Sequence, residues 1–283
     1  YRQGDTLRHR ESLQRPDREA LVLSDHPLKY VVGSGHQGRT YLVELDGFLV
    51  QSPITWYTSR QAWDLAPGYN HGDHAAFERP IPVDCLVCHA GRSESIGGAY
   101  HRVAVQEQTI DCERCHGPGS RHEAWHESAE DPDSEHDANI VHPGLLSRER
   151  SESICAQCHL QNNAAANIRG RRLTGFQPGQ KLAEHRAYFV LESPDPSMTV
   201  VGHVGQLHQS RCYTQTKTLT CTTCHDPHRT IPKAEARAWY RNKCLDCHQA
   251  DGCGLPVTDA GRRNNSDDCA TCHMPRTSTE IPH

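Results

Sequence analysis

Six copies of the pentapeptide Cys-x-x-Cys-His lie in this chain of 283 residues, beginning at positions 85, 112, 155, 221, 244 and 269. On one helical turn, residues i, i+3 and i+4 share a face, so both thiols and the imidazole of each copy point to the same side. In that arrangement the thiols can form two thioether bonds to one edge of a porphyrin while the imidazole binds the iron. This pentapeptide is the attachment signature of c-type haem.

Two other chemistries use paired cysteines, and neither accounts for the whole pattern. A structural zinc site takes four ligands in two pairs, whereas a redox dithiol needs no histidine after its second cysteine. The sequence therefore predicts six covalently bound haem c groups. The cysteines expected to form thioether bonds are Cys85, Cys88, Cys112, Cys115, Cys155, Cys158, Cys221, Cys224, Cys244, Cys247, Cys269 and Cys272. The histidines expected as proximal iron ligands are His89, His116, His159, His225, His248 and His273.

The second, distal ligand of each iron is expected to be histidine at most or all haems. Fifteen of the 21 histidines lie outside the motifs, against only two methionines in the chain. Met274 directly follows a proximal histidine and cannot reach across its own haem, and no pattern supports Met198. Because six irons need only six distal ligands, the count leaves a surplus of histidines that can be surface or propionate-bound imidazoles.

Longer phrases around the motifs resemble multihaem proteins related to cytochrome c554. The segment CERCHGPGSRH at residues 112–122 is similar to their CxxCHGPGxxH element. Similar phrases are PGYNHGDH followed by CLVCH within residues 67–89, SRC followed by CTTCHDPH within residues 210–228, and CATCHMP followed by IPH within residues 269–283. The resemblance covers about residues 28–283, and it matches whole phrases rather than the pentapeptides alone.

The resemblance implies which histidines are distal ligands. It nominates His74, His122, His203, His228 and His283, and it leaves His101, His126 and His208 as competitors for the remaining place. The relatives usually carry a further CxxCH before the segment that corresponds to residue 1, and many carry tetratricopeptide repeats after it. Neither lies in this chain, so a histidine near its end, such as His283, can serve a haem outside residues 1–283 or in another subunit.

The remaining cysteines and the cofactor indicate a compartment outside the cytoplasm. Subtracting the twelve motif cysteines from fourteen leaves Cys212 and Cys253, which are expected to form one disulfide. Covalent haem attachment takes place outside the cytoplasm in bacteria, so we expect a periplasmic or extracellular protein whose signal peptide is not in this sequence. No stretch approaches the roughly 18 apolar residues of a membrane-spanning helix.

Composition favours an unusual core. Only 35% of residues are hydrophobic and 6% aromatic, with a mean hydropathy of -0.74, which is poor in apolar residues for a domain of this length. We therefore expect a mostly irregular chain with short α-helices around a stacked haem core. The 25 arginines, against 5 lysines, can pair with haem propionates or can reflect genomic base composition. No basic cluster suggests nucleic acid.

The expected elements begin with a small sheet near the N-terminus. Asp46-Gly47 between residues 41–45 and 48–51 predicts a β-hairpin, and residues 29–32 can add a strand. We expect residues 1–84 to form a β-containing segment that packs on a hexahaem domain at 85–283. Expected helices cover about residues 120–130, opened by a capping box at Ser120 and Glu123, residues 147 into the third motif, and residues from Pro232 into the fifth. Residues 131–143 and 249–268 are expected as loops.

These expectations favour an electron-transfer protein rather than an enzyme, with no catalytic residue. Irons with two protein ligands have no open position for a substrate, whereas closely spaced haems can conduct electrons. The alternative is a reductase of nitrite or hydroxylamine-type substrates with one open haem, and a third option is a structural or haem-storage module. Expected partners are an extracytoplasmic donor and acceptor, or copies of the chain in a homo-oligomer or filament.

Overall fold

The computed structural model describes residues 1–69, 76–128, 137–160, 164–191, 202–249, 253–265 and 268–274. The chain separates into two compact units. The first comprises Tyr1–Val141 and Ala165–Ala187, and the second comprises His142–Ala164 and Tyr188–Glu280. Residue 84 lies inside the first unit, so the N-terminal strands share that unit with the first two motifs, and the other four motifs lie in the second.

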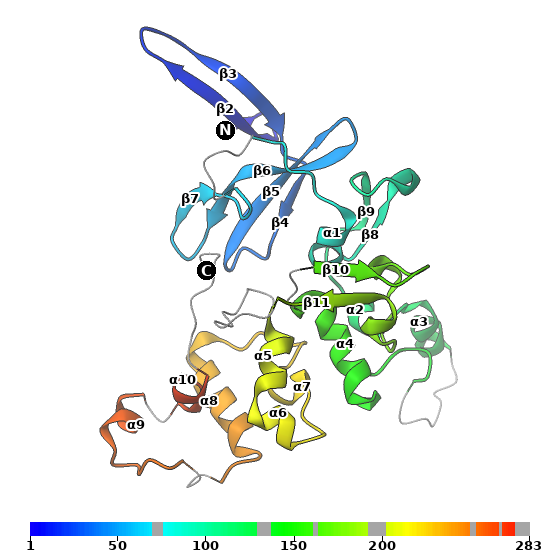
Figure 1. Cartoon of the computed structure of the whole chain (residues 1–283), viewed down its shortest axis with the longest axis vertical. Helices are drawn as coiled ribbons and strands as arrows, with labels where there is room; N and C mark the ends of the chain where they lie inside the picture. The colour runs from blue at the N-terminus through cyan, green and yellow to red at the C-terminus, as the bar shows by residue number, and fades with distance from the viewer. Residues whose placement is uncertain are drawn as a thin grey trace. The chain divides into compact units, whose positions relative to one another are not determined.

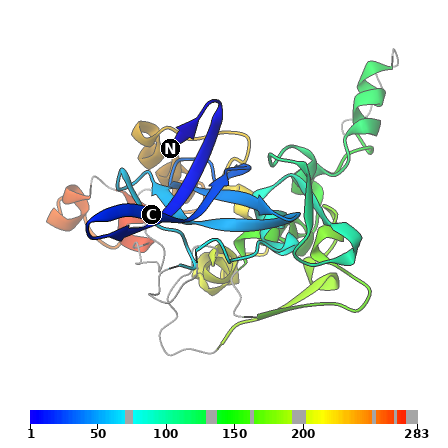
Figure 2. The same cartoon turned by 90° about the horizontal axis from the view of Figure 1, so that it is seen from above.

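The first unit opens with a long antiparallel hairpin. Strands β1 (Arg2–Gln3), β2 (Thr6–Arg15) and β3 (Arg18–Pro27) form a three-stranded sheet in that order (Figure 1 and Figure 2). Asp17 takes a positive φ of 58° in the turn between β2 and β3. The sequence did not predict this hairpin, because its strands mix charged residues with an unbroken apolar run and its turn has no glycine.

A second antiparallel sheet contains β4 (Tyr30–Val32), β5 (Gly38–Leu45), β6 (Phe48–Tyr57) and β7 (Ala62–Leu65) in that order (Figure 1). The turn between β5 and β6 has positive φ at Asp46 and at Gly47, 50° and 82°. Both values are those that a two-residue hairpin turn needs. The predicted hairpin and the additional strand are therefore confirmed.

The core of the first unit joins this sheet to the first motif. Leu42 and Leu49 pack with Val83 and Leu86, which lie on helix α1 (Val83–His89). The expected packing of the N-terminal sheet against the first haem motif has its physical basis in this cluster. The remaining elements of the unit are β8 (Arg92–Ser95), η1 (Ile96–Gly98), β9 (Val103–Glu107), α2 (Glu113–His116), α3 (Ser120–Glu127), η3 (Leu173–Gly175) and η4 (Leu182–Glu184). Strands β10 (Ala164–Asn167) and β11 (Arg186–Phe189) pair with each other. Each strand contains a position at which the sequence passes from one unit to the other.

The second unit is helical and has almost no apolar core among its described residues. Its elements are η2 (Pro143–Leu145), α4 (Arg148–His159), α5 (His203–Gln209), α6 (Arg211–Gln215), α7 (Cys221–Cys224), α8 (Lys233–Leu245), α9 (Ala260–Asn264) and α10 (Cys269–His273). The hydrophobic residues buried there are Ile154, Ala156 and Val204, and α8 buries none of its 13 residues. A unit of this kind needs apolar groups other than its own side chains to fill its interior.

Helix boundaries correct three local predictions. Gly119, not Ser120, is the N-cap of α3, so the predicted capping box is wrong; the Glu113 carboxylate instead accepts the Gly119 N–H at 2.7 Å. Pro232 is the N-cap of α8 rather than its first residue. Helix α9 lies inside the predicted loop at 249–268, because the Asp259 side chain caps it.

The fold class predicted from the sequence is confirmed in its elements: short helices, much irregular chain and small antiparallel sheets. The helix predicted from residue 147 into the third motif is confirmed as α4, with Ser147 at its N-cap position. Within the described residues, no helix combines the length and the apolar composition that crossing a membrane requires.

Candidate haem sites

Each Cys-x-x-Cys-His motif lies in or at the end of a helix. In three motifs the histidine N–H donates to the carbonyl of the first cysteine, four residues earlier: His116 to Cys112 at 2.9 Å, His225 to Cys221 at 3.0 Å and His248 to Cys244 at 2.9 Å. The first, third and sixth motifs lie within α1, α4 and α10. This helical turn places the two thiols and the imidazole on one side, as covalent attachment of a haem requires. The residues therefore fit the cofactor that the sequence predicts.

The histidine of the second motif, His116, is held in one orientation. Its Nδ1 lies 2.8 Å from the carbonyl oxygen of Val141, to which it donates, and the Val141 N–H donates to the His116 carbonyl at 2.9 Å. Donation from Nδ1 leaves the lone pair on Nε2, which is the nitrogen available to a metal.

In the first unit, the first two motifs are direct neighbours. Arg114, inside the second motif, donates a hydrogen bond to the carbonyl oxygen of Val87, inside the first. Burial raises the pKa of the Cys85 thiol, so this cysteine lies in a poorly solvated part of the unit. The first two motifs are therefore neighbours in space.

In the second unit, the four remaining motifs follow one another in space. A hydrogen bond with Cys155 of the third motif lowers the pKa of Cys221 of the fourth. Burial, together with smaller effects of the nearby Cys269 of the sixth motif and Cys224 of the fourth, raises the pKa of Cys244 in the fifth motif to about 11. Each motif therefore has the next motif of the sequence as a spatial neighbour.

The third motif is brought together with one of the nominated distal ligands. Nδ1 of His159 and Nδ1 of His203 lie 3.2 Å apart, and their rings meet edge to face. Desolvation by the surrounding chain lowers the pKa of both imidazoles, although each keeps an exposed edge. A lowered pKa keeps an imidazole neutral, and the neutral form is the one that binds a metal.

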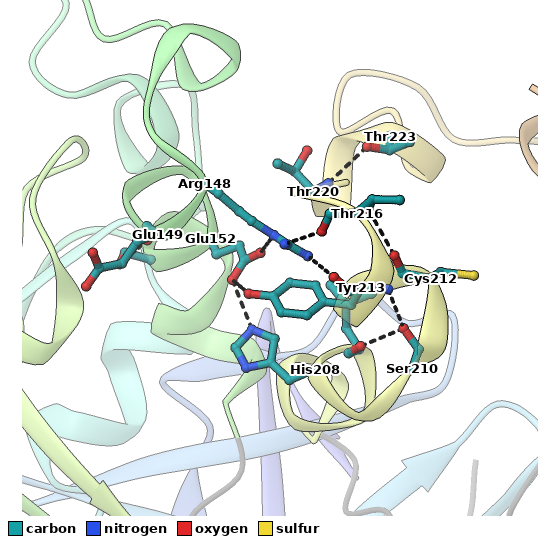
Figure 3. Close-up of polar contacts among 12 residues, drawn as sticks. Arg148, Glu149, Glu152, His208, Ser210, Cys212, Tyr213, Thr216, Thr220 and Thr223 are labelled. Atoms are coloured by element: carbon teal, nitrogen blue, oxygen red, sulfur yellow. Dashed lines mark hydrogen bonds and ion pairs between the residues drawn. The ribbon is translucent and has the colours of Figure 1, made fainter. Parts of the chain in front are cut away.

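A buried carboxylate ties the third motif to the segment before the fourth (Figure 3). Glu152 is 6% exposed; its Oε1 accepts from Arg148 Nε at 3.1 Å, and its Oε2 accepts from the Tyr213 hydroxyl and from His208 Nε2, each at 3.0 Å. The Arg148 guanidinium also donates to the carbonyls of Tyr213 and Thr216, at 3.1 and 2.8 Å. This network fixes α4 against α5 and α6. In this network Nε2 of His208, one of the candidate distal ligands, is held by the Glu152 carboxylate.

Two candidate distal ligands, His122 and His126, lie together on α3, which follows the second motif. His122 and His126 share a face, as their spacing predicts, with ring centroids 4.5 Å apart. Nδ1 of His122 lies 2.6 Å from Oδ2 of Asp137. The other oxygen of that carboxylate, Oδ1, accepts the backbone N–H of Asn139. Burial opposes ionisation of Asp137, but the hydrogen bonds from Asn139 and His122 outweigh it and lower the pKa of this carboxyl. A carboxylate on Nδ1 orients His122 for metal binding through Nε2.

The other candidates are placed less favourably or are not described. The His228 side chain is 76% exposed, with Nδ1 3.8 Å from Asp226. His101 is half-buried beside Tyr100, and its Nδ1 is buried with no hydrogen-bond partner among the described residues. His74 and His283 lie outside the described residues.

Two features could not have been found from sequence patterns. His185 is 2% exposed and follows η4, yet nothing in its sequence neighbourhood distinguishes it from the other histidines outside the motifs. Asp137 lies 15 residues from His122, at a spacing that signals no contact.

Cys212 and Cys253 are exposed free thiols here, and the disulfide between them stays a prediction.

The name of one sequence relative agrees with the class of cofactor that the motifs predict. No model of a known protein family matches the chain. The multiheme cytochrome MtrA of Shewanella baltica (strain OS185) is 22% identical over 207 residues, which are 70% of this chain and 54% of MtrA. The chain thus spans about half the length of this relative. Among solved structures, the outer cell wall cytochrome OcwA aligns with a TM-score of 0.49 and 18% identity, over 86% of this chain and 64% of OcwA.

Neither relative is named as a cytochrome c554, so that narrower assignment stays a resemblance. The six motifs and the similarity to MtrA together support the conclusion that this chain is a multihaem c-type cytochrome.

Proposed function

We propose that this chain transfers electrons, outside the cytoplasm, through six haem c groups that are mostly held by pairs of histidines. The observation that carries the proposal is the succession of motifs in the second unit, where the third, fourth, fifth and sixth motifs are neighbours in turn. Cofactors attached at adjacent cysteines form a series through which electrons can pass without leaving the protein.

The chain would hold each haem with the two cysteines and the histidine of one motif, and the haem would supply a one-electron iron centre. The role of the chain is to set the potential of that centre through its ligands and their hydrogen bonds. The Val141 carbonyl fixes the tautomer of His116 and makes its Nε2 a stronger ligand. His203, beside the third motif, is the best supported distal ligand in the second unit.

The haem count is the first test. Protein unfolded in urea should keep its haem, because thioether bonds survive unfolding, and the pyridine haemochrome assay should give about six haems per chain. Replacing both Cys155 and Cys158 with alanine should remove about one haem. A ratio of four or less in the unaltered chain would contradict the proposal.

Spectroscopy separates the carrier from the reductase. Irons with two histidine ligands are low-spin in the ferric state, so electron paramagnetic resonance should show low-spin haem almost alone. A high-spin signal equal to one haem per chain, together with reduction of nitrite or hydroxylamine by the pure protein, would favour the reductase.

The redox partners would lie outside the cytoplasm, where haem c is attached in bacteria and where a Cys212–Cys253 disulfide would be stable. Copies of the chain are among the proposed partners, because association end to end would lengthen the electron path. Light scattering by the native protein tests this part: a ladder of masses supports a filament, and one monomeric mass at all micromolar concentrations contradicts it.

A further inference from the structure

We propose that His185 is the distal ligand of the haem attached at Cys85 and Cys88, an assignment that rests on the function proposed above. His185 is not among the histidines that the sequence nominates. It lies in the first unit directly after η4, is 2% exposed, and packs edge to face on Phe176 with ring centroids 5.7 Å apart. The argument depends on its two ring nitrogens, on the residues beside it and on the neighbouring cavity.

The ring nitrogens of His185 have different surroundings. Nδ1 lies 3.3 Å from the carbonyl oxygen of Arg172, so this nitrogen carries the proton and donates it. Nε2 then carries a lone pair, and it is buried with no hydrogen-bond partner among the residues that the structure describes. A buried acceptor without a partner destabilises a fold, and a bond to a metal would remove that penalty. Donation of Nδ1 to a backbone carbonyl, with Nε2 left for the metal, is the usual arrangement of a metal-binding histidine.

An ion pair holds this histidine near the first motif. Arg186, the next residue, pairs with Asp84, which directly precedes Cys85. The two side chains are only 15% and 19% exposed, so solvent screens their attraction weakly. Helix η3, whose preceding residue Arg172 supplies the carbonyl for His185, packs against α1. The described contacts thus connect His185 to the first motif from two directions.

Arg172 also lines a cavity of about 760 Å³, whose walls include three arginines, Arg92, Arg171 and Arg172, and one carboxylate, Glu94. Arg92 is paired with Glu107 at 3.3 Å. Ser93 also lines the cavity, and the Ser93 hydroxyl is buried with no hydrogen-bond partner. Guanidinium and hydroxyl groups are suited to carboxylates. A haem ligated by His185 would therefore have cations nearby for its propionates.

His101 is the rival in the same region. The carbonyl of Tyr100, the preceding residue, accepts the N–H of Val83 at the start of α1, so His101 also lies near the first motif. Its Nδ1 is buried without a partner, but none of the described hydrogen bonds fixes the tautomer of its ring. The pre-oriented lone pair therefore favours His185.

The test uses the full haem-loaded chain with His185→Gly, His101→Gly and, as a control, His9→Phe. His9 is another largely buried imidazole of the first unit, and its Nδ1 is taken by the Ser52 hydroxyl at 2.7 Å. His185→Gly should keep all its haem in the haemochrome assay but convert about one haem per chain to the high-spin ferric form. Added imidazole should fill the space and restore the low-spin form, which a merely structural role of His185 would not allow. The other two variants should stay low-spin.

A second variant tests the assignment independently if His185→Gly does not fold. His185→Met should keep that haem six-coordinate and raise its midpoint potential. A methionine ligand stabilises ferrous iron more than a second histidine does. The assignment is overturned if both His185 variants keep unchanged spin states and potentials, or if His101→Gly produces the high-spin haem instead. Failure of the unaltered chain to retain haem after unfolding would refute the proposed function itself, which is a different result.

Discussion

Removing the charge of Glu152 should destabilise the second unit by about 3 kcal/mol. Glu152→Gln keeps the volume of the side chain, so it creates no cavity; it removes the charge and replaces one acceptor oxygen with an NH2 group. Three donors converge on this carboxylate, from Arg148, Tyr213 and His208, at 3.0 to 3.1 Å. The Arg148 guanidinium keeps its carbonyl partners after the change, but it loses its counter-charge.

Two estimates give this magnitude. Hydrogen bonds to a charged group contribute about 1.5–3 kcal/mol each and neutral ones about 0.5–1.5, so the loss is about 1 kcal/mol for each of three bonds. Breaking a buried ion pair by removing one partner costs about 3–5 kcal/mol. Glu152 and Arg148 have side chains 8% and 21% exposed, and this partial contact of Arg148 with water places the expected value at the lower end.

Urea unfolding of the haem-loaded protein, followed by circular dichroism, measures the effect. The matched control is Glu235→Gln, which removes the carboxylate from another arginine–glutamate pair of the same unit. In that pair Arg229 and Glu235 have side chains 49% and 57% exposed, and exposed pairs contribute at most about 1 kcal/mol. Tyr213→Phe, which removes one donor and keeps the ring, should fall between the two.

Equal midpoints for Glu152→Gln and Glu235→Gln would refute the reasoning. Such a result would mean that water reaches Glu152 once the haems are in place, so that the carboxylate no longer depends on its three donors. A Tyr213→Phe variant as stable as the unaltered chain would also refute the reasoning. It would show that the Tyr213 hydroxyl contributes nothing to the stability of the network.

Three further predictions concern single side chains. Burial lowers the pKa of His9 to about 4, below its ordinary value of 6.5, so on acidification the unfolded chain binds this proton before the folded chain does. The free energy of unfolding should therefore fall as pH drops from about 6.5 to about 4. Thermal melts of His9→Phe should lose that part of the pH dependence. If His122 is an iron ligand, Asp137→Asn should raise the potential of its haem in voltammetry, by about 59 mV for each tenfold loss of preference for ferric iron. Cys212 and Cys253 should resist alkylation in unfolded, unreduced protein, and loss of their disulfide should cost roughly 3–4 kcal/mol.

Local features of the fold could be predicted from the sequence because short segments determine them. The Asp46-Gly47 turn follows from two residues that tolerate positive φ, and both adopt it. The helix predicted from residue 147 runs into a motif that is itself helical, although the Ser147 side chain makes no capping hydrogen bond. The motif turns follow from the requirement that two thioether-forming cysteines and one iron-binding histidine share one face.

Contacts between distant residues could not be predicted in this way. Glu152 meets His208 and Tyr213 across 56 and 61 residues, and each of the three is unremarkable in its own segment. The two nitrogens of His185 are distinguished only by a carbonyl 13 residues earlier and by burial. The choice of distal ligands depends on such contacts, so a histidine count alone left it open.

The helices that carry the second, fourth and sixth motifs have only four or five residues. Isolated helices shorter than about 12–15 residues are marginal in water, so these turns should be unstable in the chain before haem is attached. The enzymes that attach haem would therefore meet an extended chain, and each thioether pair would nucleate the turn around it. Compaction of the second unit then follows cofactor delivery in time. Under haem shortage, cells should degrade this polypeptide rather than accumulate it as a folded apoprotein.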